Sequence, residues 1–91
     1  MDGKRVGVIG VVVENPKAVQ QRLNDFISQA GDIIIGRMGI PQREQNVAVI
    51  ALLVDGTTDD INTLTGQLGS LPGVSVRAAL TRKGIGGTQD D

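Results

Sequence analysis

The stretch VGVIGVVV, Val6 to Val13, is almost entirely apolar and rich in β-branched residues, which predicts a β-strand from about Arg5 to Glu14. The stretch VAVIALLV, Val47 to Val54, has the same character. A strand with one face in water alternates apolar and polar residues, so we expect both of these strands to be covered on both faces. A chain of 91 residues is too short to provide that cover alone. The sequence therefore predicts a domain that is completed by a second copy of itself.

A helix is expected directly after the first strand. Asn15 is typical of a helix N-cap, and Pro16 suits the first helical position. The apolar residues that follow have helical spacing and form one stripe: Val19, Leu23, Phe26, Ile27 and Ala30. Gly31 is predicted to end this helix in a left-handed conformation. A second strand is expected from Asp32 to about Ile40, closed by Pro41.

The second half of the chain repeats this pattern. The polar segment 41–46 predicts an antiparallel hairpin that leads into a third strand from Val47 to about Asp55. Thr57 and Asp60 resemble a capping box at the start of a second helix. The apolar stripe of this helix consists of Ile61, Leu64, Leu68 and Leu71. Pro72-Gly73 is predicted to stop the helix, and a fourth strand with alternating side chains then runs from Val74 to Leu80.

This order of elements predicts an α+β, ferredoxin-like βαββαβ sandwich, with a four-stranded antiparallel sheet and two helices on one face. The two most apolar strands are expected at the centre, because the second strand carries Arg37 and the fourth carries Arg77. Residues 1–83 are predicted to form one domain and residues 84–91 a disordered tail. The sheet face without helices should be apolar, which predicts a homodimer or tetramer formed through the sheet.

The amino-acid composition argues against several classes of function. The chain has no cysteine or histidine, which removes thiol nucleophiles, thiolate metal sites and the usual general base at neutral pH. We therefore expect no cofactor, no metal and no catalytic residue. The 9 basic and 10 acidic residues give a net charge of −1, so direct binding to nucleic acid is not expected. No apolar run reaches the ~20 residues that cross a bilayer, and we expect a cytoplasmic protein.

The candidate ligand-binding residues lie in two segments. Glu14 and Asn15 precede the first helix, where free backbone N–H groups could hold the carboxylate or phosphate of a small anionic effector. The alternative is that Asn15 only caps the helix. In the second segment Gly39 permits close backbone approach, while Arg37 and Arg43 could clamp an anion. A bulged edge strand and a solvated hairpin tip are the alternatives there.

Glycines also occur within the second predicted helix. Gly66 and Gly69 are three residues apart and therefore lie on one side of it. Each weakens the helix by up to ~1 kcal/mol, so we interpret the pair as a place of close packing. Asp59-Asp60 suits the first turn of a helix, and two carboxylates are too few for a metal site.

Three segments carry a resemblance to a known family: Val11–Pro16 (VVVENP), Gly36–Ile50 (GRMGIPQREQNVAVI) and Leu64–Val74 (LTGQLGSLPGV). From about Val6 to Lys83 the chain resembles the iron-only hydrogenase system regulators. The resemblance implies an ACT-like fold, similar to the C-terminal ligand-binding domain of nickel-responsive repressors, and a regulatory oligomer. ACT domains take small effectors, often amino acids, near the first strand–helix loop, which corresponds here to residues 14–16.

Two departures limit what the resemblance implies. Nickel repressors bind their metal through His and Cys, both of which this chain lacks. They also carry a separate DNA-binding segment, whereas only about five residues precede the first predicted strand here. Nickel sensing and direct DNA binding are therefore not expected, although members of the family are often labelled transcriptional regulators.

Two functions follow as hypotheses. The first is an effector-sensing regulatory oligomer of a hydrogenase system, which acts through a small ligand or a protein partner and is not an enzyme. The alternative is a small ferredoxin-fold enzyme whose working groups are Arg37, Arg43 and Glu44 of the 36–44 hairpin. The absence of His, Cys and Tyr leaves few side chains that exchange protons near neutral pH, which favours the first hypothesis.

Overall fold

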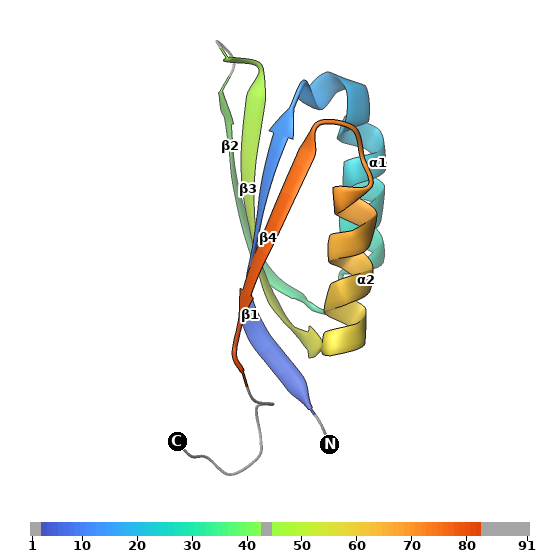
Figure 1. Cartoon of the computed structure of the whole chain (residues 1–91), viewed down its shortest axis with the longest axis vertical. Coiled ribbons are helices and arrows are strands. Elements are labelled where there is room, and N and C mark those ends of the chain that lie inside the picture. Colours follow the sequence, from blue (N-terminus) through green and yellow to red (C-terminus); the bar gives the residue numbers. More distant parts are fainter. Residues whose placement is uncertain (1–2, 43–44, 83–91) are drawn as a thin grey trace.

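A computed structural model of the chain describes residues 3–42 and 45–82. Its elements are β1 (Lys4–Glu14), α1 (Pro16–Gln29), β2 (Ile34–Gln42), β3 (Val47–Thr57), α2 (Thr58–Gly69) and β4 (Val74–Leu80). The strands form an antiparallel sheet in the order β2-β3-β1-β4, and both helices cover the same face of it (Figure 1). The predicted βαββαβ sandwich is confirmed, as are the central positions of β1 and β3 and the edge positions of β2 and β4. The predicted tail, 84–91, lies outside the described residues.

The hydrophobic core fills the space between the sheet and the helices. Alternate residues of β1 point into it, and the register places Ile9 opposite Leu52 and Val11 opposite Ile50. The predicted stripes supply the helical side of the core: Val19, Leu23 and Ile27 from α1, and Ile61, Leu64 and Leu68 from α2. Phe26 and Ala30, which were predicted on the same stripe, pack at the margin of the core and are half-buried. No polar or charged side chain is buried in the described part of the chain.

The start of α1 corrects one prediction. Asn15 occupies the N-cap position, but it has a left-handed backbone (φ 56°) and its side chain makes no capping hydrogen bond. Instead its Oδ1 accepts a hydrogen bond from Nδ2 of Asn46, at 3.2 Å. Asparagine tolerates left-handed geometry, and this geometry turns the chain from β1 into α1 within one residue. Pro16 does stand at the start of the helix, as predicted.

The start of α2 follows the prediction. The Thr57 hydroxyl accepts a hydrogen bond from the backbone N–H of Asp60 at 3.1 Å, as an N-cap does. Asp59 and Asp60 lie in the first turn, where the helix dipole favours negative charge.

The helix C-termini differ from the predictions. The α1 helix ends at Gln29, and the described glycine with positive φ is Gly73 (φ 75°), not Gly31. The turn after α1 needs no left-handed residue because short i→i+3 bonds close it, such as Ile33 N–H to Ala30 C=O at 3.0 Å. The α2 helix ends at Gly69, before Pro72-Gly73. The prediction of close packing at Gly66 is also wrong, since an added Cβ there would meet nothing within 4 Å.

The β2 strand differs from the prediction at both ends. β2 begins at Ile34 rather than Asp32, and it continues through Pro41 to Gln42. An edge strand tolerates proline, so Pro41 does not close it. A register shift between Ile34 and Gly36 agrees with the bulged edge strand that was the alternative interpretation of this segment. Neither described helix is long and apolar enough to span a membrane.

Candidate functional site

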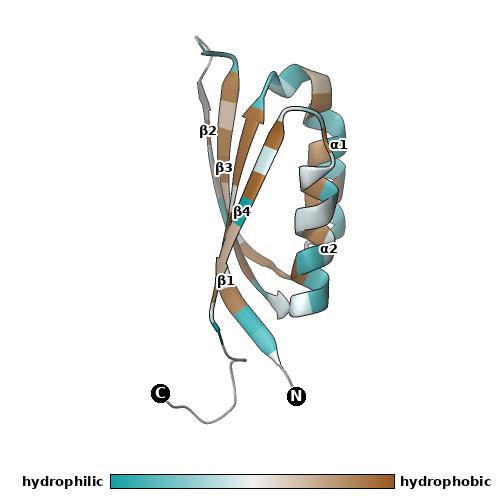
Figure 2. Ribbon diagram, viewed as in Figure 1, coloured by the Kyte–Doolittle hydropathy of each residue, from teal (hydrophilic) through white to brown (hydrophobic). Residues whose placement is uncertain are grey.

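The sheet face that carries no helix is apolar. Its large exposed side chains come from three neighbouring strands and are Val12, Met38, Ile40, Val49 and Leu53. The register aligns them in cross-strand rows, with Val12, Val49 and Ile40 side by side and Met38 next to Ala51. We call this surface the outer sheet face. Figure 2 shows that the sheet strands are largely hydrophobic, whereas the helices present hydrophilic residues to the outside.

The exposure of this face is too large to be incidental. Met38 is 69% exposed, Ile40 56% and Leu53 48%, although all three are large apolar side chains. Burial of one such side chain stabilises a protein by about 1.5–3 kcal/mol. Monomeric soluble proteins rarely expose contiguous apolar patches of more than a few hundred Å². The outer sheet face therefore has the chemistry of an interface.

A groove lies on the opposite side of the sheet, between the first half of α1 and the β2–β3 hairpin. Its volume is about 780 Å³. Its lining residues are Pro16, Lys17, Gln20, Leu23, Asn24, Arg37, Asn46, Val47, Ala48 and Ile50. We call it the α1–β2 groove. Leu23 and Ile50 belong to the core and form its apolar floor, so a ligand here would meet apolar and polar groups together.

The local structure explains which polar side chains reach this groove. Lys17, Gln20 and Asn24 are spaced three and four residues apart, which places them on one face of α1. Arg37 is paired with Leu52, whose side chain is in the core, so it lies on the helix side of the sheet. Its neighbour Met38 is consequently on the outer sheet face. Arg37 stays exposed because β2 is the edge strand beside α1.

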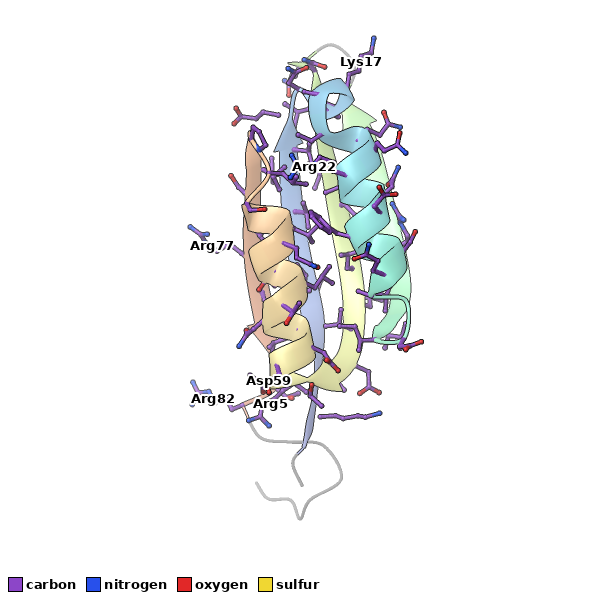
Figure 3. All side chains as sticks on the ribbon, turned by 90° about the vertical axis from the view of Figure 1, so that its right-hand side faces the viewer. Arg5, Lys17, Arg22, Asp59, Arg77 and Arg82 are labelled. Carbon is purple, nitrogen blue, oxygen red and sulfur yellow. The ribbon has the colours of Figure 1, made fainter. Side chains whose placement is uncertain are left out.

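The charge of the groove is positive. Among the described residues that line it, Lys17 and Arg37 are the only charged ones and none carries a carboxylate. A second, smaller pocket of about 290 Å³ lies between the end of α1 and the start of α2, and there the charged lining residues are Asp32 and Asp60. Figure 3 shows Lys17 at the start of α1, at the opposite end of the helix layer from Asp59. An anion would therefore find complementary charge in the α1–β2 groove.

The structure separates the predicted ligand-binding residues. Arg37 lines the groove, and Asn15 adjoins it through its hydrogen bond to Asn46. Gly39 lies on the same side of β2 as Arg37, opposite Ile50, but an added Cβ would have an ordinary contact distance of 3.7 Å, so no close approach requires glycine there. Glu14 is not part of the lining, and its backbone N–H donates to the Gly73 carbonyl at 2.8 Å. Arg43 lies outside the described residues.

Sequence reasoning missed four polar residues of the groove: Lys17, Gln20, Asn24 and Asn46. Lys17, Gln20 and Asn24 could have been found from the sequence, because their helical spacing can be read from it. Their position beside Arg37 could not, since it depends on where α1 crosses the sheet.

Comparison with known proteins identifies the family. The sequence profile described as "Iron-only hydrogenase system regulator, putative", of TM1266-like proteins, matches residues 5–78. This chain belongs to that family. The structure of the uncharacterized protein TM1266 from Thermotoga maritima is similar to it, with a TM-score of 0.82, 32% sequence identity, and coverage of 87% of this chain and 99% of that one. Membership supports a regulatory role, and the resemblance seen in the sequence is confirmed.

More distant structures share the fold alone. The apo form of CPII from Thiomonas intermedia K12, a nitrogen regulatory PII-like protein, has a TM-score of 0.54 at 12% identity, over 85% of this chain and 89% of that one. No match was found among curated proteins.

Proposed function

We propose that this chain is a cytoplasmic regulatory protein of an iron-only hydrogenase system that acts as a homo-oligomer and not as an enzyme. In this proposal the copies associate through the outer sheet face, and the α1–β2 groove takes a small anionic ligand. The apolar outer sheet face is the observation that carries the proposal.

Self-association accounts for this face without any further partner. Each protomer offers apolar rows on three adjacent strands, and a second copy offers the same surface about a two-fold axis. In the described part of the chain, the charged side chains of this face lie at its margin, with Arg77 on the β4 side and Asp55 towards one end. A two-layer contact of this kind removes the apolar rows from water while the margin stays solvated.

The groove suits an anion that has an apolar part. Arginine binds carboxylate and phosphate groups through two parallel hydrogen bonds, and Lys17 adds a second positive charge. The amide side chains of Gln20, Asn24 and Asn46 offer donors and acceptors for the rest of the ligand. The apolar floor favours a ligand with some carbon surface, such as an amino acid or a nucleotide.

The enzymatic alternative has less support. Arginine, lysine and amide side chains bind and orient, but they do not exchange protons readily near neutral pH. The chain contains no His, Cys or Tyr that would supply this chemistry. Ligand sensing requires only the binding groups that line the groove.

Association through the outer sheet face is tested with Met38→Glu. Met38 is 69% exposed in the single protomer, so the variant should fold as the wild type does. Because a carboxylate in the contact would lose its hydration, we expect the dissociation constant to rise at least about a hundredfold. Sedimentation velocity over a concentration series measures this change. Gln21→Glu on the exposed surface of α1 adds the same charge and should leave the constant unchanged. Unchanged association of Met38→Glu would refute this role of the face.

Ligand binding is tested with three probes: inorganic phosphate, glutamate and adenosine monophosphate. If the groove takes anions, at least one of them should raise the melting temperature, and Arg37→Gln should remove most of that rise. Arg22→Gln is the matched control, because Arg22 is also on the helix layer but does not line the groove. An equal response of both variants would contradict binding in the groove.

A further inference from the structure

The two edges of the sheet are built differently. The β2 edge contains glycines, a proline and a register shift, all of which hinder the addition of another strand. The β4 edge is a regular strand of 7 residues, VSVRAAL, without glycine or proline. Among the described residues no strand covers its outer side, because β4 is the last strand in the sheet order. This edge can therefore accept another strand.

The hydrogen bonds at both ends of β4 determine which backbone groups are free. Thr81 N–H donates to the Val6 carbonyl at 2.9 Å, and Glu14 N–H donates to the Gly73 carbonyl at 2.8 Å. In an antiparallel ladder the bonded residues alternate, so Ser75, Arg77 and Ala79 direct their backbone groups towards β1. Val76, Ala78 and Leu80 direct theirs to the open edge.

A groove runs along this open edge. It has a volume of about 730 Å³ and lies between β4 and the stripe of α2 formed by Asn62, Thr65, Gly66 and Gly69. An added Cβ at Gly66 would meet nothing within 4 Å, and one at Gly69 would only just reach Val76 Cγ2, at 4.0 Å. Neither glycine therefore serves packing within the described chain, although both weaken the helix. Small residues here leave space for something that approaches from outside.

We propose that β4 pairs with β4 of a second copy in antiparallel orientation, with Ala78 opposite its own equivalent. This register pairs Val76 with Leu80 of the second copy, so all three residues with free backbone groups take part. The two sheets would then continue as one, and the two α2 helices would lie side by side. The occupant of the groove is the α2 stripe of the second copy.

Three observations favour this register over its neighbours. A register centred on Arg77 would place two like charges directly opposite each other, which is destabilising. A register centred on Val76 would need the Val74 N–H, which already donates to the Leu71 carbonyl at 3.2 Å. In the proposed register Arg77 faces Ala79. The Arg77 guanidinium already donates to the Val76 carbonyl at 3.0 Å, and a carbonyl oxygen accepts a second bond.

The helices support the same centre. Gly69 lies beside Val76, and α2 and β4 run in opposite directions (Figure 1). Two residues along β4 advance about 6.6 Å, which corresponds to about four residues of a helix. Ala78 is therefore level with Thr65, in the middle of the α2 stripe. A two-fold axis at Ala78 brings the two stripes into register, and Figure 3 shows Arg77 directed away from the helices at the free side of β4.

This contact is separate from the outer sheet face, because it uses the edge of the sheet and one side of α2. It does not depend on the proposed regulatory function. If both contacts form and their two-fold axes intersect at right angles, they generate a closed assembly of four copies with two kinds of two-fold interface.

Amide hydrogen exchange of the full-length wild type tests the pairing. The Ala79 amide donates to β1 in every case and serves as the internal reference. With a paired edge, the Ala78 and Leu80 amides should exchange within about tenfold of Ala79. With an open edge they should exchange at least about a hundredfold faster, which would overturn the proposal.

A substitution separates a second copy from other causes of protection. Gly66→Arg fills the space on α2 and replaces glycine by a better helix former, so the protomer should stay folded by circular dichroism. The Met38→Glu background lacks the proposed outer-face contact, and there we expect sedimentation to show an assembly of two copies. When Gly66→Arg is added to this background, we expect a single copy and rapid exchange of the Ala78 amide. Thr63→Arg, on the side of α2 that faces α1, should keep two copies. Protected amides in a single copy, or two copies with Gly66→Arg, would each refute the proposal.

Discussion

The two faces of the sheet have similar apolar side chains but opposite surroundings. On the inner face Ile9, Leu52 and Val54 are completely buried beneath the helices. On the outer face Leu53, the immediate neighbour of Leu52, is 48% exposed, and Met38 is 69% exposed. The comparison shows that side-chain type does not decide which face is covered within a protomer. Two helices cover one face only, and in the proposed assembly a second copy covers the other.

Truncation of one leucine on each face is expected to have the largest effect. Leu52→Ala should lower the free energy of unfolding of the protomer by about 2–5 kcal/mol, since it leaves a cavity in the core. Leu53→Ala should change it by less than about 1 kcal/mol and act on association instead. Urea unfolding in a Met38→Glu, Gly66→Arg background, which lacks both proposed contacts, measures the protomer alone. Equal losses for the two variants would show that the faces are not distinct.

Two glycines of β1, Gly7 and Gly10, provide a second comparison. An added Cβ at Gly7 would collide with the Ala79 carbonyl oxygen and with Leu80, whereas one at Gly10 has its nearest contact, the Arg77 carbonyl oxygen, at 3.8 Å. We expect Gly7→Ala to destabilise the protomer by about 1–3 kcal/mol. Gly10→Ala should be neutral or stabilise it by up to about 1 kcal/mol. Thermal unfolding of the two variants provides the test, and a larger loss for Gly10→Ala would contradict the described register.

Loss of the N-cap hydrogen bond of α2, one of the helices that cover the inner face, should have a smaller effect on stability. Thr57→Ala removes the oxygen that accepts from Asp60 N–H, so we expect a loss of about 1 kcal/mol. Thr57→Ser retains that oxygen and should lose much less. Denaturant midpoints of the three proteins distinguish these outcomes, and equal midpoints for Thr57→Ala and the wild type would refute the capping role.

The smallest effect is expected at Asn15. Asn15→Gly keeps the left-handed conformation and removes only the exposed hydrogen bond to Asn46, so the loss should stay below about 0.5 kcal/mol. Asn15→Ala should cost more, because alanine disfavours that conformation. The opposite order, again from denaturant midpoints, would contradict the left-handed conformation of Asn15.

The fold could be predicted from sequence because its signals are local and agree with one another. The apolar runs at Val6–Val13 and Val47–Val54 predicted the central strands, and the stripes beginning at Val19 and Ile61 predicted the helices. The errors occurred where one residue type suits two geometries. Asn15 is typical both of an N-cap and of a left-handed turn, and Gly31 follows a helix that ends without a positive φ.

The candidate site was only partly predictable. Arg37 was found because an arginine between glycines is conspicuous, but its partner Lys17 is an ordinary surface residue until the structure places α1 beside β2. Gly39 was selected for a close approach that its surroundings do not require. Contacts between distant segments depend on how elements pack, and a local pattern does not contain that information.

Methyl NMR with a soluble paramagnetic agent shows whether a second copy covers the outer sheet face in solution. The inner-face Leu52 methyls provide the buried reference within the same full-length protein. We predict that in the wild type the methyls of Met38 and Leu53 are shielded from the agent as well as those of Leu52. In each of the variants Met38→Ala, Leu53→Ala and Ile40→Glu, the methyls of Met38 and Leu53 that the substitution leaves in place should become accessible to the agent. Strong paramagnetic broadening of the Met38 and Leu53 methyls in the wild type would show that no second copy covers this face.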